Sequence, residues 1–370
     1  MRRNKGIQRG VKVMSKQENE QFKFDVVIGN PPYQDETIGD NKTYAPPIYH
    51  KFLDEAYKVG NIVEMIHPGR FLFNAGSTPK AWNKKMLNSV QFKIIGYFAN
   101  SADIFPNVGI AGGVVISYFN KNAHYDAIKV FTPFNELNTI LRKVLKVNNY
   151  GYVESIVTGR GVYKLSEQAL KDYPQIEDLQ SKGHKKDVGS GAFRVLKDVI
   201  FFKYKPSDTN NDWVKFLGLE GRERKYWWAR SIYQNVPESF YNYKIFIPKS
   251  YGTGLTSSPS TVIGKPLIGE PNVGATETFL SIGNFKTSNE AEACLKYIKS
   301  KFARVMLGVL KVTQDNPAPK WKYVPLQDFT SNSDIDWTKS IPEIDQQLYR
   351  KYGLSQEEID FIETHVKEMN

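Results

Sequence analysis

Four short runs of mostly apolar, strand-forming residues recur in the first third of the chain and alternate with stretches of helical periodicity. They are FDVVIG (24–29), NIVEMI (61–66), FKIIGYF (92–98) and GGVVISYF (112–119). Continuous apolar runs are typical of strands in parallel sheets that are covered on both faces. The stretch 46–59 between the first two runs places five apolar residues on one side of a helix: Ile48, Phe52, Leu53, Ala56 and Tyr57. The alternation predicts an α/β fold over residues 1–150, with 24–29 as a buried strand.

The sequence changes character after about residue 150. Residues 151–330 mix short β-rich pieces, such as YKIFIP (243–248), with loops rich in Gly, Ser and Pro. A single long helical pattern over 288–310 interrupts them and includes Cys294, which we interpret as a small core residue. The composition predicts a second, α+β domain over 151–330.

The last forty residues, 331–370, predict a helical hairpin. Ser340 can cap a helix that ends before Gly353, and Ser355 with Glu358 forms an S-x-x-E capping box for a final helix. Two helices joined by a short turn also fit a helix-turn-helix motif. Because the final helix has several acidic side chains, which repel phosphates, we favour a packing hairpin.

The net charge and the cysteine content limit which binding partners and which cellular location are expected for the protein. The net charge is +11 and 13% of the residues are aromatic, which favours a polyanionic partner such as nucleic acid. One cysteine excludes an intramolecular disulfide and a cysteine-based metal cage, and the five histidines have no metal-ligand spacing. We see neither a signal peptide nor an apolar run of membrane-spanning length. A reducing cytoplasm is the expected location.

The first apolar run ends in an unusually rigid polar turn, Asn30-Pro31-Pro32-Tyr33. Ligand sites in open parallel sheets lie at the carboxyl ends of the strands, which is where this turn begins. The Asn30 side-chain oxygen and the Pro31 carbonyl can accept two hydrogen bonds from one amino group, and the prolines restrict the backbone. Tyr33 adds a flat ring nearby. This set of groups predicts a site that holds an amino group on an aromatic heterocycle and stabilises the positive charge that develops when the nitrogen attacks a methyl donor.

The N-P-P-Y sequence after an apolar strand resembles the catalytic motif of the DNA methyltransferases that act on adenine N6 or cytosine N4. Tyr33 at the last position favours N6-adenine. The order of PPIYHKFLDEAYK, IVEMIHPGRFLFN and ADIFPNVGIAGGVVISYF further along the chain resembles the successive motifs of restriction–modification methylases. The resemblance implies part of a class I (Rossmann-like) methyltransferase sheet, followed by a target-recognition domain.

The resemblance also implies roles for individual residues. Asn30 and Pro31 would accept from the adenine N6 amino group, Pro32 would stiffen the turn, and Tyr33 would stack on a base flipped out of the duplex. Phe105 matches the position where the family offers a second aromatic ring to the base; the alternative interpretation is a core phenylalanine beside a loop. No residue for the methyl donor can be assigned.

The methyl donor of this family, S-adenosylmethionine, is held by an F-x-G-x-G loop after an earlier strand. The 24 residues before Asp25 are too few for that strand, its loop and helix, and a second strand. A strand followed by G-x-G at 245–255 does not lead into a helix, which the loop requires. The resemblance therefore implies a partial chain that needs a donor-binding half, on a separate polypeptide, truncated or lost.

The second domain would then contact double-stranded DNA. Basic and aromatic residues interleave in GRERKYWWARSIY (221–233), and 311–329 resembles the closing stretch of large restriction–modification enzymes. The candidate DNA-binding residues are Arg222, Arg224, Lys225, Arg230, Lys311 and Lys320. The alternative interpretation of 221–233 is a solvated basic stretch with two buried tryptophans.

Two other functions remain open. Asp212, Glu223 and Lys225 form a D-x10-E-x-K pattern that can bind Mg²⁺ in a restriction endonuclease. The other alternative is a DNA specificity module without catalytic activity, because the donor-binding half is missing.

Overall fold

The computed structural model describes most of the chain, which forms two compact units, Met1–Pro133 and Phe134–Asn370. The described residues are 23–35, 45–73, 77–106, 109–110, 112–208, 212–252, 255, 259–311 and 314–369. The polar segment before residue 23 lies outside this range, as do Thr253 and Gly254 of the G-x-G stretch. Each unit is described by itself.

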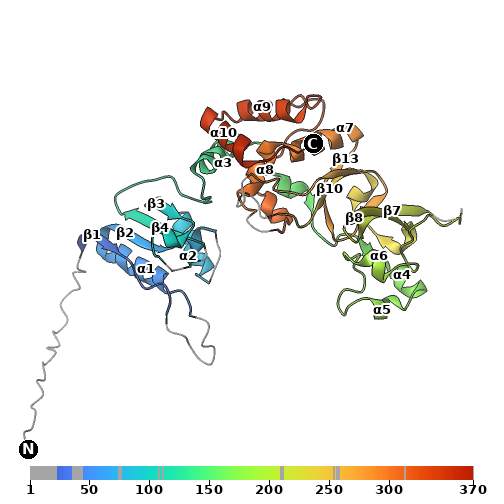
Figure 1. Cartoon of the computed structure of the whole chain (residues 1–370), viewed down its shortest axis with the longest axis horizontal. Helices are drawn as coiled ribbons and strands as arrows, with labels where there is room; N and C mark the ends of the chain where they lie inside the picture. The colour runs from blue at the N-terminus through green and yellow to red at the C-terminus, as the bar shows by residue number, and fades with distance from the viewer. Residues whose placement is uncertain are drawn as a thin grey trace, which may run out of the picture. The chain divides into compact units, whose positions relative to one another are not determined.

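The described part of the first unit contains four strands and two α-helices (Figure 1). In chain order they are β1 (Phe24–Gly29), α1 (Tyr49–Val59), β2 (Gly60–Pro68), α2 (Lys80–Leu87), β3 (Phe92–Phe98) and β4 (Val114–Asn120). Helix α1 buries Tyr49, Leu53 and Ala56 against the sheet, whereas Phe52 is 44% exposed and lies off the predicted apolar stripe. The α/β prediction and all four strands are confirmed.

The sheet has the strand order β1-β2-β4-β3, and only β1 and β2 are parallel. Strand β4 lies between β2 and β3 and is antiparallel to both. A single connection from β3 back to β4 allows the antiparallel pairing, whereas β1 and β2 are joined through α1, as a parallel pair requires. The sheet is therefore mixed, which corrects the purely parallel arrangement that the apolar runs suggested.

Strand β1 is an edge strand among the strands described, and it is not buried as predicted. Phe24 and Val26 are each 50% exposed and Ile28 is 75% exposed. The expectation was wrong because an apolar run favours a buried strand but does not determine what covers it. Within the described residues, only β2 pairs with β1. An edge strand with three exposed apolar side chains is a ready surface for another strand or layer.

The second unit is a mixture of short strands and helices. Its elements are α3 (Asn135–Val147), β5 (Val157–Thr158), β6 (Lys164–Leu165), α4 (Glu167–Asp172), α5 (Ile176–Leu179), α6 (Ala192–Val195), β7 (Trp213–Glu220), β8 (Glu223–Arg230), β9 (Gln234–Asn235), β10 (Tyr243–Pro248), β11 (Leu267–Gly269), β12 (Val273–Ala275), β13 (Phe279–Phe285), α7 (Ser288–Lys299), α8 (Lys301–Gly308), α9 (Ile341–Lys351) and α10 (Gln356–His365). Strands β10, β11, β13 and β5 form one sheet, and β12, β7 and β8 form another. Both sheets contribute to one apolar core, in which Trp227 stacks on Phe193 with ring centroids 4.9 Å apart.

The first unit ends earlier than residue 150. Helix α3 was assigned to the catalytic domain, but it packs on α10 near the end of the chain, where Thr139 and Lys143 both bond the Glu358 carboxylate at 2.7 Å. Glu358 is only 4% exposed. Although burial raises the pKa of Glu358, the bonds from Lys143 and Thr139 outweigh it and hold the pKa below its usual value. A buried, paired carboxylate fixes α3 in the second unit, so the boundary lies at Pro133.

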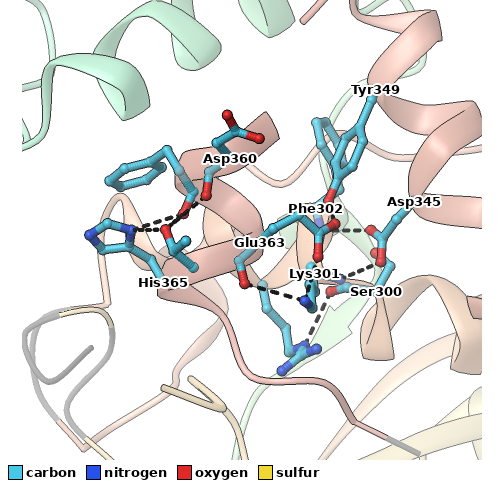
Figure 2. A network of polar contacts seen from close by, with 11 residues as sticks. Ser300, Lys301, Phe302, Asp345, Tyr349, Asp360, Glu363 and His365 are labelled. Atoms are coloured by element: carbon cyan, nitrogen blue, oxygen red, sulfur yellow. Dashed lines mark hydrogen bonds and ion pairs between the residues drawn. The ribbon is translucent and has the colours of Figure 1, made fainter. Parts of the chain in front are cut away.

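The helix predicted over 288–310 is two helices, because the backbone of Ser300 is extended between α7 and α8. The Ser300 hydroxyl accepts from the N–H of Ala303 at 3.1 Å. The carboxylate of Asp345 in α9 accepts from the N–H groups of Lys301 and Phe302 at 3.0 and 2.9 Å (Figure 2). Two side chains thus satisfy the donors at the start of α8. Cys294 is fully buried in α7, as predicted for a core residue.

The C-terminal residues form the predicted helical hairpin. Helix α9 follows Ser340, Gly353 has a positive φ of 60°, and the Ser355 hydroxyl accepts from the N–H of Glu358 in α10. Phe361 and Ile362 of α10 are buried, and α10 lies beside α3 and α8 (Figure 1). Helix α10 thus uses Phe361, Ile362 and the buried Glu358 in packing, which agrees with a packing hairpin. In the part of the chain described, no helix has both the length and the apolar character needed to cross a membrane.

Replacing Lys244 by methionine is expected to destabilise the second unit by about 3 kcal/mol. Lys244 is fully buried in β10, where burial lowers its pKa to about 7, and its ammonium group donates to the carbonyls of Phe240, Asn242 and Glu270. Methionine fills similar volume but leaves three acceptors without their donor. Urea unfolding followed by tryptophan fluorescence measures the change. Lys286→Met, at an exposed position, is the matched control; equal stability of the two variants would contradict the structural role.

Candidate active site

The loops that bear the candidate catalytic residues meet at one edge of the first sheet. Strands β1 and β2 run parallel with Gly29 opposite Met65, so both end at this edge. Strand β4 begins at the same edge, because Val114 lies opposite both Pro68 and Phe98. The turn after β1 and the loop between β3 and β4 are therefore neighbours, as the predicted site requires.

Asn30 follows β1 directly and is exposed, whereas Pro31 is buried and Tyr33 is half-buried. Two backbone hydrogen bonds join this turn to a second Pro-Pro segment, 46–47. The N–H of Ile48 donates to the Tyr33 carbonyl at 3.1 Å, and the N–H of Asp35 donates to the Pro46 carbonyl at 2.9 Å. The turn that presents Asn30 is thus held by its neighbour as well as by its own prolines.

The two aromatic residues expected to contact a base lie beside each other. The rings of Tyr33 and Phe105 have centroids 6.4 Å apart and meet edge to face at 69°. Burial raises the pKa of Tyr33, and its hydroxyl is shielded from solvent without a hydrogen-bond partner in the described structure. Phe105 follows a short 3-10 turn, and its N–H donates to the Ser101 carbonyl at 2.8 Å. The pairing of the rings was not visible in the sequence, where they are 72 residues apart.

Gly113, just before β4, lies close to the end of β3 at this edge. The N–H of Gly69 donates to the Gly113 carbonyl at 2.9 Å. Gly113 has a φ of 72°, and a Cβ atom there would lie 2.5 Å from the Phe98 carbonyl oxygen. Only glycine fits this position. It brings the chain leading from Phe105 back against the end of β3.

His67 and Tyr49 form a buried layer next to this edge that the sequence analysis missed. His67 is fully buried at the end of β2, stacks on Tyr49 at 5.3 Å and has Nε2 2.8 Å from the Ser117 hydroxyl. Burial lowers the pKa of His67 to about 4, so the ring is neutral at pH 7. The Tyr49 hydroxyl bonds Thr78 at 2.9 Å. These contacts hold the end of β2 in place. The only sequence signal for them is the M-I-H-P-G stretch at the end of β2.

The basic candidates of the second unit do not form one surface. Arg222 is exposed at the β7–β8 turn, and Lys225 pairs with Glu223 at 2.6 Å. The guanidinium of Arg224 donates to the Lys265 carbonyl at 2.6 Å, and that of Arg230 donates to the Tyr233 hydroxyl at 3.3 Å. Arg222 is thus the candidate that best meets the expectation of an exposed basic side chain.

Lys311 is wrongly placed among the surface candidates. It is fully buried and its ammonium group donates to the Tyr251 carbonyl at 2.6 Å. Lys320 also bonds a backbone carbonyl, that of Leu310, at 2.8 Å. A buried lysine that donates to backbone carbonyls stabilises the folded unit, and its ammonium group is inaccessible to a DNA phosphate. Of the tryptophan pair, Trp227 is buried as expected and Trp228 is half-exposed.

The nuclease pattern does not converge. Asp212 precedes β7 and Glu223 begins β8, and the register pairs Trp213 with Arg230 and Glu220 with Glu223. The two carboxylates therefore lie at opposite ends of an eight-residue hairpin, about 25 Å apart. They cannot bind the same metal ion. The described residues contain no group of three His, Cys, Asp or Glu side chains placed to hold one.

The stretch of the chain that carries the candidate site is similar to known proteins. Residues 3–105 match the model of the Eco57I restriction-modification methylase family. An uncharacterized adenine-specific methylase of Mycoplasma pneumoniae is 31% identical over 103 residues, which are 27% of this chain and about a quarter (24%) of that protein. The matched stretch of the chain contains Asn30, Tyr33 and Phe105.

Two solved structures are similar over 92% of the chain. One is the type IIG restriction endonuclease BpuSI, with 9% identity and a TM-score of 0.32, and the other is the type IIL restriction-modification enzyme MmeI in complex with DNA, with 10% identity and a TM-score of 0.36. The alignments span 54% and 56% of those proteins, so the chain corresponds to about half the length of each. Over residues 3–105, which carry the candidate site, the chain is thus similar to the Eco57I restriction-modification methylases and to an adenine-specific methylase.

Proposed function

We propose that the chain is the target-binding part of a site-specific DNA methyltransferase that methylates adenine at N6. The observation that supports it most directly is the arrangement at the sheet edge: an exposed Asn30 on a clamped Pro-Pro turn, with the rings of Tyr33 and Phe105 beside it. Asparagine and proline oxygens suit an exocyclic amino group, and paired aromatic rings suit a flipped base.

Each residue would have a distinct role. The side-chain oxygen of Asn30 and the carbonyl of Pro31 accept the two N6 protons and stabilise positive charge on the nitrogen during attack. Pro32 restricts the turn, so the acceptors are in place before the base arrives. Tyr33 and Phe105 hold the flipped adenine ring. S-adenosylmethionine would supply the methyl group.

The described sheet does not offer a complete site for this donor. The two loops that follow its parallel strands begin NPPY and GRFL, and neither contains the F-x-G-x-G sequence of the family's donor site. The three exposed apolar side chains of β1 support the idea that further structure packs against this part of the sheet. We therefore place the donor-binding half outside these residues.

Donor binding and complementation test the proposal. The full chain alone is expected to show no measurable binding of S-adenosylmethionine in a calorimetric titration. With the product of the neighbouring reading frame supplied, tritiated methyl groups should be transferred to mixed-sequence duplex DNA. Tight binding by the chain alone would overturn the incomplete site. Methyl groups on cytosine instead of adenine would overturn the proposed substrate.

The second candidate is a DNA specificity module without catalytic activity. Such a module does not need S-adenosylmethionine, so an incomplete donor site is compatible with it. It predicts DNA binding by the complete system with no methyl transfer. The product analysis of the same experiment separates the two.

A further inference from the structure

The half-exposed side chain of Trp228 in the β7–β8 hairpin has two lysines close to its ring. The ammonium nitrogens of Lys205 and Lys215 lie 5.3 and 5.1 Å from the centroid of its ring. Trp228 is half-exposed, whereas its neighbours Trp227 and Ala229 point into the core. The alternation of side chains along β8 thus separates one buried tryptophan from one that is presented to solvent.

The backbone around this ring is firmly held. Trp228 pairs with Lys215 across the hairpin, and on its other side it exchanges two backbone hydrogen bonds of 2.8 Å with Phe202. The Phe202 ring contacts Trp213 edge to face at 5.5 Å. Strand pairs on both sides fix the ring and the base of Lys215, so the surface exists before any ligand binds.

The two lysines have no acidic partner among the described residues, in contrast to other lysines of the same hairpin region. Lys203 pairs with Glu220 at 3.0 Å and Lys225 pairs with Glu223 at 2.6 Å. Lys205 and Lys215 are exposed, and both ammonium groups are directed to one ring. Ammonium groups without a carboxylate partner retain a positive charge that a phosphate can neutralise.

Tyr204, next to Lys205 in the chain, is a further exposed aromatic side chain in this segment. It precedes Lys205 and is 79% exposed, the highest exposure among the large apolar and aromatic side chains described. Cations beside an exposed aromatic surface are the combination that suits a nucleic-acid strand, whose phosphates and sugars need both kinds of contact.

We propose that Lys205, Lys215 and Trp228 form a phosphate-contacting surface for DNA. This surface is separate from the basic residues of 221–225, and it rests on the proposed function for the identity of the nucleic acid. The two ammonium groups bind one or two neighbouring phosphates of the DNA backbone, and the Trp228 ring packs against the adjoining sugar. Such contacts position the duplex without reading its sequence.

The test is the salt dependence of DNA binding by the full chain. Binding of mixed-sequence duplex DNA is measured by fluorescence anisotropy between 50 and 300 mM salt, roughly the range over which phosphate contacts dominate affinity. The double variant Lys205→Ala/Lys215→Ala should bind about 10- to 100-fold more weakly at low salt. The slope of log affinity against log salt should fall by about 1 to 2, because each phosphate that the variant no longer neutralises lowers the slope by roughly one.

A matched double variant removes the same charge from lysines that are already ion-paired. Lys185→Ala/Lys203→Ala should change the affinity by less than about threefold, because each ammonium group is already paired with a carboxylate, of Glu177 and Glu220 respectively. Lys205→Arg/Lys215→Arg should keep the wild-type slope. Equal losses in the two alanine variants, or an unchanged slope in the Lys205/Lys215 variant, would overturn the surface, as would a wild-type chain that binds no DNA.

Failure of this surface differs from failure of the proposed function. If the complementation assay transfers methyl groups to DNA and the Lys205/Lys215 variant binds like the wild type, the surface is wrong and the function stands. If the double variant shows the expected loss and no methyl transfer occurs in the complete system, the surface stands and the methyltransferase proposal fails. Circular dichroism checks that the variants fold alike.

Discussion

Replacing Asn30 by alanine is expected to lower methyl transfer by about 100- to 1000-fold in the complete system. The side-chain oxygen of Asn30 would be one of two acceptors for the adenine amino group, and it acts on charge that develops only during the attack. The exposed position of Asn30 on a clamped turn means that alanine removes the acceptor without disturbing the core. Single-turnover transfer of tritiated methyl groups to duplex DNA measures the loss.

The matched control is Asn122→Ala, an exposed asparagine in the turn that follows β4 at the opposite end of the sheet. It should retain full activity. DNA affinity of the Asn30 variant should stay within about threefold of the wild type, because base stacking and phosphate contacts remain. Full activity of Asn30→Ala in the complete system would remove the catalytic assignment.

Replacing Asp345 by alanine is expected to destabilise the second unit by about 3 kcal/mol. Asp345 is 2% exposed and accepts from the two N–H groups that begin α8 (Figure 2). Alanine leaves the two N–H groups without this acceptor, and the N–H of Phe302 is buried. Urea unfolding followed by tryptophan fluorescence measures the change. Asp360→Ala, which removes an exposed carboxylate from the neighbouring helix α10, should change stability by less than about 0.5 kcal/mol.

The cost of Asp345→Ala should depend on pH. Burial raises the pKa of Asp345 from 3.8 to about 6, although the bonds from Phe302 and Lys301 oppose the rise. A carboxyl group with a raised pKa in the folded state stabilises the fold fully below its unfolded pKa and loses that contribution as the pH rises through about 6. The variant should therefore lose more stability at pH 5 than at pH 8. A larger loss at pH 8 would show that the ionised form is the one that the fold favours.

The sequence by itself located the strands and the motif. Each strand of the first sheet lies in a run of strand-forming residues bounded by polar or turn-forming residues, and local preference is enough to place it. The N-P-P-Y turn is also local, since its stiffness comes from its own prolines. The caps at Ser340 and Ser355 lie within three residues of their partners, so the last two helices were predictable for the same reason.

Features that depend on distant residues were decided by the tertiary structure alone. No glycine or proline near Ser300 indicates the break between α7 and α8. The break is stabilised by Asp345, a residue 45 positions away. The sequence suggests that Lys311 is a surface cation, but its side chain is buried and its ammonium group donates to the carbonyl of Tyr251. The pairing of Tyr33 with Phe105 arises because two loops meet at one sheet edge. Residue types and spacing specify local conformation and the chemistry on offer, whereas burial and partners depend on which distant segments pack together.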